Sequence, residues 1–198
     1  MIYYITYFLT KFVSLIYFPR TIYGYEHIPL NGGFILASNH LSNLDPVVMG
    51  ISAGRRINFM AKIELFRKQP LGFLLTKLGA FPVKRGEADF GALKEAVKRL
   101  NKGKPVLMFI EGARRAGDAL PKAQPGVGFL AVKAKVPVIP VYVDGTQNVM
   151  PPRHKFLVRN PVTIRFDPPV NVDPLAPYQT IADGILRGIY CLKNISSS

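Results

Sequence analysis

The sequence predicts one α/β domain built around a largely parallel central sheet that is flanked by helices. Three observations support this fold class. The chain has 198 residues, which is long enough for one domain with a well-buried core. Residues 105–110 and 136–143 are short and almost wholly apolar, as strands buried on both faces of a parallel sheet are. Amphipathic helical patterns alternate with such runs, and no repeat or linker divides the sequence.

The first 18 residues form an amphipathic segment. When they are projected at about 100° per residue, one arc of roughly 140° carries Tyr3, Thr6, Tyr7, Thr10, Lys11, Ser14 and Tyr17, and Tyr4 and Phe18 lie at its margins. The opposite side carries Ile2, Ile5, Phe8, Leu9, Phe12, Val13, Leu15 and Ile16. As a helix the segment is about 27 Å long, shorter than the roughly 30 Å of a bilayer core, and Lys11 would lie near its middle. We therefore expect residues 1–18 to be a helix lying in the membrane interface and residues 19–198 to form the folded domain.

Two other structures remain open for this segment. It could span the membrane at a tilt, or it could dock on the domain by its apolar face as a core helix. Because it has neither a basic start nor a small-residue cleavage site, we do not expect a signal peptide.

Strands and helices are expected to alternate after this segment. Residues 32–38 predict a buried strand, because they end in an apolar run. Asp45–Pro46 predicts the start of a short helix, since Asp is a favoured N-cap and Pro suits the first helical position. Residues 57–62 predict a second strand, and the leucines of 71–78 predict a helix that ends at Gly79.

The amphipathic helix expected over residues 89–102 has the clearest pattern, and Gly103 closes it. Its inward side is expected to carry Phe90, Leu93, Val97 and Leu100. The remaining expected elements are strands at 105–110, 136–143 and 162–166, a helix at 126–135, and a closing helix marked by Ile181, Ile185, Ile189 and Leu192.

The charge and the cysteine content limit the environment and the partners. The net charge of +14 favours anionic partners: a nucleic acid, an acidic membrane face or a phosphorylated small molecule. The sequence has no block of Lys and Arg, no zinc-ligand spacing and no aromatic RNA-binding motif. The charge therefore leaves a nucleic acid partner open, but no motif supports one and we expect no nucleic acid partner. The single cysteine, Cys191, excludes an intramolecular disulfide and suits a reducing compartment.

His40 and Asp45 are the first candidates for chemistry. They lie where the strand at 32–38 gives way to a helix, and the turn between them can bring their side chains together. A neutral imidazole can remove a proton from an alcohol if its other nitrogen is held and the developing imidazolium is stabilised. A carboxylate performs both tasks. The alternative role of Asp45 is structural, as the N-cap of the helix.

Two basic turns are candidates for binding an anion. In "FIEGARR", Glu111 ends a strand, Gly112 allows close backbone approach, and Arg114 follows; Arg85 lies in the turn of "FPVKRG". Arginine binds phosphate through a planar fork, and a glutamate can orient that fork or accept a ligand hydroxyl. Since these turns and His40 each follow an apolar run, we expect them to meet at one edge of the sheet. The alternative is a solvated turn with an ordinary ion pair.

Four blocks in this order resemble the lysophosphatidic acid acyltransferase family of glycerolipid acyltransferases, over roughly residues 25–165. "NHLSNLD" matches the family's catalytic Asn-His-x4-Asp motif at His40 and Asp45, and "GAFPVKRG" is similar to the second block, whose arginine falls on Arg85. "FIEGARR" is similar to the third block, usually Phe-Pro-Glu-Gly-Thr-Arg-Ser, and "VPVIPV" is similar to the apolar fourth block. The departures in the third block are Ile110, Ala113 and Arg115.

The resemblance implies an enzyme with an acyltransferase domain over 19–198. It would move a fatty acyl group from acyl-CoA or acyl carrier protein (ACP) to the free hydroxyl of 1-acylglycerol 3-phosphate, which gives phosphatidic acid in phospholipid biosynthesis. His40 would be the general base and Asp45 its orienting carboxylate. The phosphoglycerol end of the acceptor would be held by Arg85, Glu111, Gly112 and Arg114. We expect no metal and no cofactor beyond the acyl donor, and we expect peripheral or monotopic attachment at the cytoplasmic face of a membrane.

Three alternatives remain open. The acceptor could be glycerol 3-phosphate, another lysophospholipid or a lyso-aminolipid. The protein could instead be a non-catalytic peripheral protein that binds anionic lipids, although lipid binding alone needs neither His40 nor Asp45. A basic nucleic-acid-binding protein is the third alternative, and its affinity would fall steeply with salt.

Overall fold

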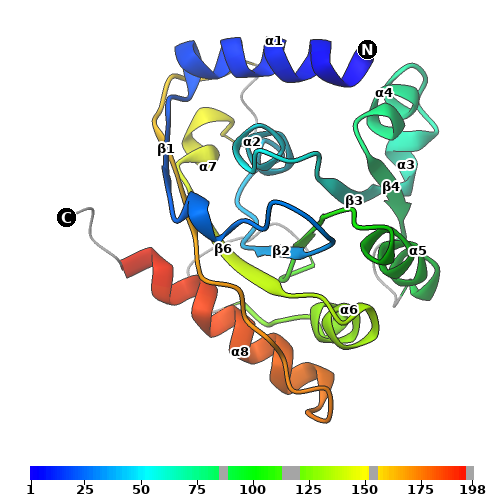
Figure 1. The fold of residues 1–198 in the computed structure, drawn as a ribbon. Coiled ribbons are helices and arrows are strands. Elements are labelled where there is room, and N and C mark those ends of the chain that lie inside the picture. The colour runs from blue at the N-terminus through cyan, green and yellow to red at the C-terminus, as the bar shows by residue number, and fades with distance from the viewer. Residues whose placement is uncertain (85–88, 113–120, 152–155, 195–198) are drawn as a thin grey trace.

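The alternation in the sequence corresponds to an ordered sheet in the computed structural model, which describes residues 1–84, 89–112, 121–151 and 156–194. Within these ranges, seven strands form one sheet in the order β1-β7-β6-β2-β5-β3-β4 (Figure 1). The strands are β1 (Arg20–Tyr23), β2 (Ile35–Ser38), β3 (Asn58–Lys62), β4 (Ala80–Val83), β5 (Val106–Phe109), β6 (Val138–Asp144) and β7 (Val162–Phe166). Neighbouring strands run parallel except β6 and β7, which are antiparallel. The predicted α/β class with a largely parallel sheet is therefore confirmed.

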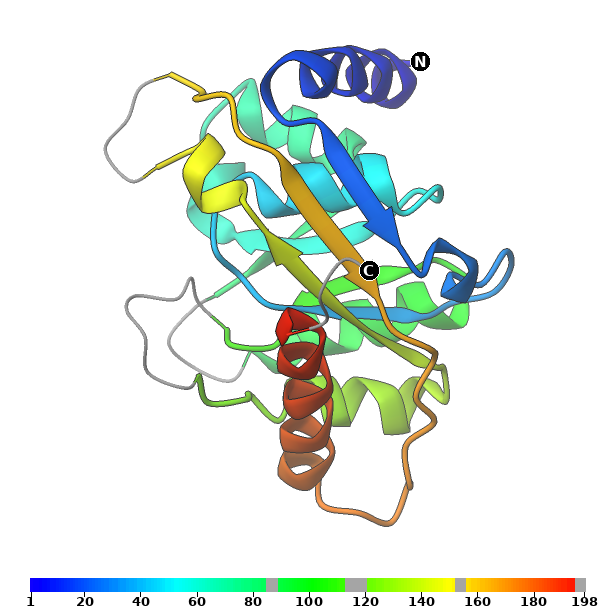
Figure 2. The same ribbon diagram turned by 90° about the vertical axis from the view of Figure 1, so that its left-hand side faces the viewer.

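Helices cover both faces of the sheet (Figures 1 and 2). In the described residues they are α1 (Ile2–Tyr17), α2 (Asp45–Ser52), α3 (Ile63–Phe66), α4 (Leu71–Lys77), α5 (Phe90–Asn101), α6 (Gly126–Ala134), α7 (Thr146–Val149) and α8 (Tyr178–Cys191), with 3-10 turns η1 (Tyr25–His27) and η2 (Leu192–Asn194). One core lies between the sheet and α5, α6 and α8. The other lies on the opposite face beneath α2, and side chains of α1 pack against its edge.

The central strand β2 shows why its sequence is apolar without alternation. Ile35 and Ala37 belong to the core beneath α5, α6 and α8. Leu36, and Phe34 just before the strand, belong to the core beneath α2. All four side chains are fully buried. A strand covered by helices on both faces has no polar side, which explains the continuous apolar run.

Four short elements, β1, β4, α3 and α7, were not predicted from the sequence. β1 is an edge strand that pairs with β7, and its four residues alternate between half-buried and exposed. α3 and α7 have four residues each, which is about one helical turn. A segment of that length repeats neither the helical nor the strand period often enough to be recognised.

The start of α5 agrees with the sequence prediction, although one inward residue does not. Asp89 accepts hydrogen bonds from the backbone amides of Lys84 at 2.8 Å and Ala92 at 3.0 Å. These bonds, that of Lys84 first, favour the ionised carboxyl and hold the pKa of Asp89 below its usual value. Phe90 was wrongly expected to face inward. Phe90 is the first residue of α5, and at this N-terminal end of the helix its side chain is 64% exposed and lines a cavity described below.

α1 lies on the domain by its tyrosine-rich side. The guanidinium of Arg56 stands 4.8 Å from the ring centre of Tyr3, and Ser14 on the same side is buried. The apolar side faces away from the domain, and Phe8 and Phe12 remain 65% and 63% exposed. Docking by the apolar face, one of the alternatives left open by the sequence, is therefore wrong. Among the helices of the described residues, none has the combined length and hydrophobicity needed to cross a bilayer.

Candidate active site

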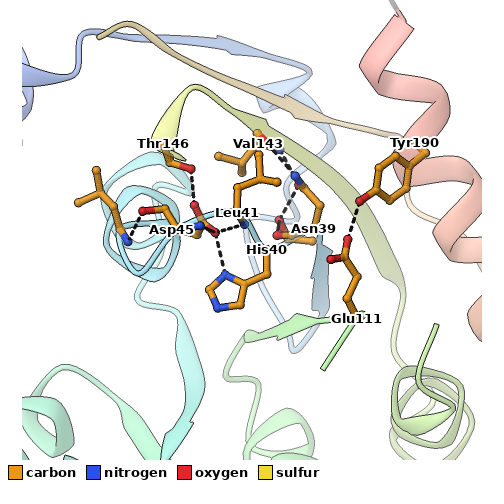
Figure 3. A network of polar contacts seen from close by, with 11 residues as sticks. Asn39, His40, Leu41, Asp45, Glu111, Val143, Thr146 and Tyr190 are labelled. Carbon is orange, nitrogen blue, oxygen red and sulfur yellow. Dashed lines mark hydrogen bonds and ion pairs between the residues drawn. The ribbon is translucent and has the colours of Figure 1, made fainter. Parts of the chain in front are cut away.

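The carboxyl end of β2 carries the pair predicted from the sequence. β2 ends at Ser38, and Asp45 is the first residue of α2. The loop between them returns to the strand end, so that Asp45 Oδ2 lies 2.7 Å from Nδ1 of His40 (Figure 3). His40 is 4% exposed and Asp45 is fully buried. The loop therefore forms a buried imidazole–carboxylate pair at the end of a central strand.

The ring of His40 is held at one edge and on one face. A carboxylate can only accept a hydrogen bond, so Nδ1 carries the proton in the bond to Asp45. Nε2 is then the ring atom with the available lone pair. The imidazole stacks on Phe109 of β5, with 3.9 Å between ring centroids and 14° between planes. Phe109 is in place for this contact because β5 pairs with β2, with Phe109 opposite Ser38.

The Asp45 carboxylate is held by donors from three directions. Besides His40, Oδ2 accepts the backbone amides of Leu41 at 2.7 Å and Ser42 at 2.8 Å. Oδ1 accepts the hydroxyl of Thr146 on α7 at 2.5 Å. These bonds offset the cost of burying a negative charge, which is several kcal/mol for an unpaired ion. The N-cap role considered for Asp45 is wrong, because the carboxylate binds amides of the preceding loop and makes no capping bond to α2.

Asn39 fixes the backbone just before His40. Its side-chain amide donates to the carbonyl of Val143 at 2.8 Å, and its oxygen accepts the Val143 amide at 2.8 Å. Asn39 is fully buried, and this pair of bonds ties the end of β2 to the neighbouring strand β6. Sequence reasoning assigned no role to Asn39, although a polar side chain at the end of an apolar run must find partners once it is buried.

The turn after β5 carries Glu111 and Gly112. Glu111 Oε1 accepts the hydroxyl of Tyr190 at 2.6 Å, so α8 orients this carboxylate (Figure 3). Gly112 has φ 72°, a conformation that suits glycine, and its amide donates to the carbonyl of Phe109 at 3.1 Å. The Gly112 amide is therefore used within the turn. Tyr190 was not singled out from the sequence, because it lies on a helix 79 residues away from Glu111.

The expectation that His40 and the two basic turns meet at one edge of the sheet can be examined only for the turn after β5. β2 and β5 are parallel neighbours, so the turn with Glu111 and the loop with His40 leave the same edge of the sheet. Arg85 and Arg114 lie outside the described residues. In the ranges that the structure describes, no group of three or more His, Cys, Asp or Glu side chains is arranged to hold a metal ion.

A large cavity of about 750 Å³ opens beside this edge. Its wall includes Phe109, which stacks on His40, and continues to the turn at Glu111 and Gly112. Most of the remaining wall is apolar and comes from β3, β5, α5 and α6, with Met60, Phe90, Leu93, Leu107, Met108 and Phe129. The cavity therefore has mainly apolar walls and also includes polar residues of the turn after β5, beside the ring that stacks on His40.

Comparison with known proteins identifies similar chains. A family model described as acyltransferase matches residues 19–144. The chain is 32% identical over 125 residues to a 1-acyl-sn-glycerol-3-phosphate acyltransferase of Bacillus subtilis (strain 168), covering 63% of this chain and 62% of that protein. It is 30% identical over 144 residues to a 1-acyl-sn-glycerol-3-phosphate acyltransferase of Streptococcus pneumoniae, covering 72% of this chain and 52% of that protein. The chain thus spans less than two thirds of the length of these relatives.

A solved structure has the same fold. The crystal structure of the 1-acyl-sn-glycerophosphate (LPA) acyltransferase PlsC of Thermotoga maritima superposes with a TM-score of 0.76 over 98% of this chain and 80% of that chain. The sequence identity is 23%, so this likeness establishes the architecture only. The matched family region contains His40, Asp45 and Glu111, whereas Thr146 and Tyr190 lie beyond its end.

Proposed function

The chain belongs to the acyltransferase family, and from that premise we propose that it acylates the free hydroxyl of 1-acylglycerol 3-phosphate to give phosphatidic acid. The donor in this proposal is a thioester, acyl-CoA or acyl-ACP. The observation that carries the proposal is the buried pair of His40 and Asp45, 2.7 Å apart, in the region that matches the family. Burying an ionisable pair at a sheet edge is costly, and general-base chemistry gives it a purpose.

His40 acts as the general base in the proposed reaction. Nε2 takes the proton of the acceptor hydroxyl as its oxygen attacks the thioester carbonyl. The imidazolium is stabilised by Asp45 through the bond at Nδ1. When the tetrahedral intermediate collapses, the carbon–sulfur bond breaks and the imidazolium returns its proton to the leaving thiolate. No covalent acyl-enzyme forms, and the ester and the free thiol are the only products.

The turn after β5 is proposed to bind the phosphoglycerol end of the acceptor. Arg114, together with Arg85 from the other basic turn, supplies positive charge for the phosphate. Glu111 is oriented by Tyr190 and accepts a hydroxyl of the acceptor or aligns an arginine fork. Gly112 has no side chain, so the ligand can approach the backbone of the turn closely. Its φ of 72° would strain any other residue at this position.

The apolar part of the 750 Å³ cavity is proposed to hold a fatty acyl chain. The cavity passes Phe109, so a chain within it would end near the imidazole that this ring supports. Its volume lies in the range of small-molecule sites, and its walls are mainly apolar with a few polar groups, among them Glu111. That distribution suits a substrate with a long hydrocarbon tail and a polar reacting group.

α1 is proposed to attach the protein to one leaflet of a membrane. The outward side carries seven large side chains that are between 50% and 67% exposed: Tyr4, Ile5, Phe8, Leu9, Phe12, Leu15 and Ile16. Such a face gains free energy when it enters the interface, and the net charge of +14 adds attraction to anionic headgroups. We propose that the protein attaches to the cytoplasmic face of the membrane, where acyl-CoA and acyl-ACP are available. In this proposal residues 1–18 are the membrane helix and residues 19–198 are the acyltransferase domain.

A direct assay tests the reaction. The purified protein is incubated with a panel of acyl-CoA and acyl-ACP donors and with several acceptors, among them 1-acylglycerol 3-phosphate, glycerol 3-phosphate and other lysophospholipids. Mass detection should show phosphatidic acid that forms with the wild-type protein and not with a folded His40→Ala variant. Turnover of His40→Ala close to wild type would exclude the mechanism. If a different acylated product forms, the acceptor proposed here is wrong and the acceptor of that product is the substrate.

A further inference from the structure

We propose that Thr146 is a positioning residue for acyl transfer, which holds the second oxygen of the Asp45 carboxylate and thereby fixes the imidazole of His40. The inference rests on the function proposed above. Thr146 lies two residues past the end of the region that matches the acyltransferase family model, residues 19–144. It comes to the site from α7, 101 residues after Asp45 in the chain.

The two oxygens of Asp45 are held unequally. Oδ2 accepts three hydrogen bonds, from the His40 ring and from two backbone amides of the loop. Oδ1 accepts the Thr146 hydroxyl at 2.5 Å, and both residues are fully buried. Since a carboxylate cannot donate, the hydroxyl hydrogen points at Oδ1. Thr146 therefore sets the rotation of the carboxylate plane, and with it the direction in which Oδ2 meets the imidazole.

The position of Thr146 is fixed by the turn between β6 and α7. Gly145 has φ 89°, and a Cβ atom at this position would lie 2.2 Å from the carbonyl oxygen of Pro161. Only glycine fits this turn, because any side chain would meet backbone. Thr146 then begins α7 with its hydroxyl directed into the site (Figure 3).

The same end of β6 supports both members of the catalytic pair. Val143 exchanges two hydrogen bonds with the Asn39 side chain, next to His40. Three residues later Thr146 binds Asp45. A buried carboxylate oxygen that loses its donor carries an uncompensated partial charge, and the group then turns or attracts water. Either change displaces the imidazole from the geometry that proton transfer needs.

Three substitutions separate the hydroxyl from the shape of the side chain. Thr146→Val keeps the branched shape and removes the donor. Thr146→Ser and Thr146→Ala both lack the methyl group and differ from each other only in the hydroxyl. Thr163→Val, at a half-buried residue on the neighbouring strand β7, is the matched control. Steady-state kinetics at varied donor and acceptor concentrations give kcat and both KM values. Thermal unfolding of each variant shows whether it is folded.

Loss of the hydroxyl should act on turnover and not on binding. Thr146→Val and Thr146→Ala should lower kcat by about 10- to 100-fold with both KM values within about threefold of wild type. Thr146→Ser should stay within about threefold in kcat, and Thr163→Val should match wild type. If Thr146→Ser is as impaired as Thr146→Ala, or if KM rises while kcat is kept, Thr146 has a packing role and the inference is wrong. A kcat of Thr146→Val close to wild type would also overturn it. If Thr146→Val does not unfold cooperatively, the Ser and Ala pair decides. An inactive wild-type protein would refute the proposed function itself.

Discussion

Asp45→Asn removes one negative charge from the site and keeps the shape of the side chain. The asparagine oxygen can take the place of Oδ2 and accept the amides of Leu41 and Ser42. Its amide group then faces Thr146, whose hydroxyl can turn to accept a hydrogen bond. Because the donors and acceptors remain matched, we expect this variant to fold and to unfold within a few degrees of wild type.

The loss should fall on the proton-transfer step. With 2.7 Å between the ring nitrogen and the carboxylate oxygen, the centres of charge of the imidazolium and the carboxylate lie about 4 Å apart. Their attraction is about 4 kcal/mol at an effective dielectric constant of roughly 20. Its removal corresponds to a fall in kcat of about a thousandfold. Both KM values should change little, because the charge pair exists only after the proton has moved.

Thiol release from the donor at saturating acceptor measures this kcat. Asp183→Asn is a suitable control, since it removes one negative charge from α8 at a carboxylate that binds Gln179, and it should leave kcat within about twofold. A folded Asp45→Asn protein whose kcat lies within tenfold of wild type would refute the electrostatic role of Asp45.

Three further predictions concern phosphate binding, membrane attachment and stability. Arg114→Ala and Arg85→Ala should each raise the KM of the phosphorylated acceptor by about tenfold or more, since a charged hydrogen bond is worth about 1.5–3 kcal/mol; a rise confined to the donor KM would contradict this assignment. Phe12→Glu should weaken binding to anionic vesicles at least tenfold, because burying a phenylalanine is worth about 1.5–3 kcal/mol, whereas Leu175→Glu at a 91% exposed loop residue should bind as wild type. Equal binding of these two variants in a vesicle sedimentation assay would exclude α1 as the attachment site. Asp89→Ala should lower the free energy of unfolding by about 1 kcal/mol near pH 7 through loss of the cap. The pKa of Asp89 is lowered in the folded protein, so this contribution is present above the unfolded pKa and is lost as the pH falls through the folded pKa. Denaturant titrations of the wild type and the variant should therefore converge at acid pH, and a difference that does not change with pH would contradict the cap.

Features set by short stretches of chain could be predicted from the sequence. The strand over 35–38 follows from an unbroken apolar run, and the start of the helix at Asp45 follows from Pro46, which suits the first turn of a helix. Because only a few residues separate these elements, the contact between His40 and Asp45 could also be anticipated. The two faces of α1 follow from the helical period in the same way.

Contacts between distant segments depended on the order of the strands. Asn39 meets Val143 across 104 residues, and Glu111 meets Tyr190 across 79 residues. A positional signal existed for Thr146, since it follows the apolar run at 136–143 as His40 follows the run at 32–38. That signal could not be used without knowing that β6 is the neighbour of β2.

Tertiary structure also decided which side of α1 faces the domain. Periodicity separates a helix into two faces, but it does not say what each face contacts. The tyrosine-rich side packs on the domain through contacts such as Tyr3 with Arg56, and the apolar side is left outward. A local sequence pattern predicts whether a segment is a helix or a strand, because that choice depends mainly on neighbouring residues. Partners across the sheet are chosen only when the whole chain is packed, since the free energy that selects them comes from burial and hydrogen bonding between elements far apart in sequence.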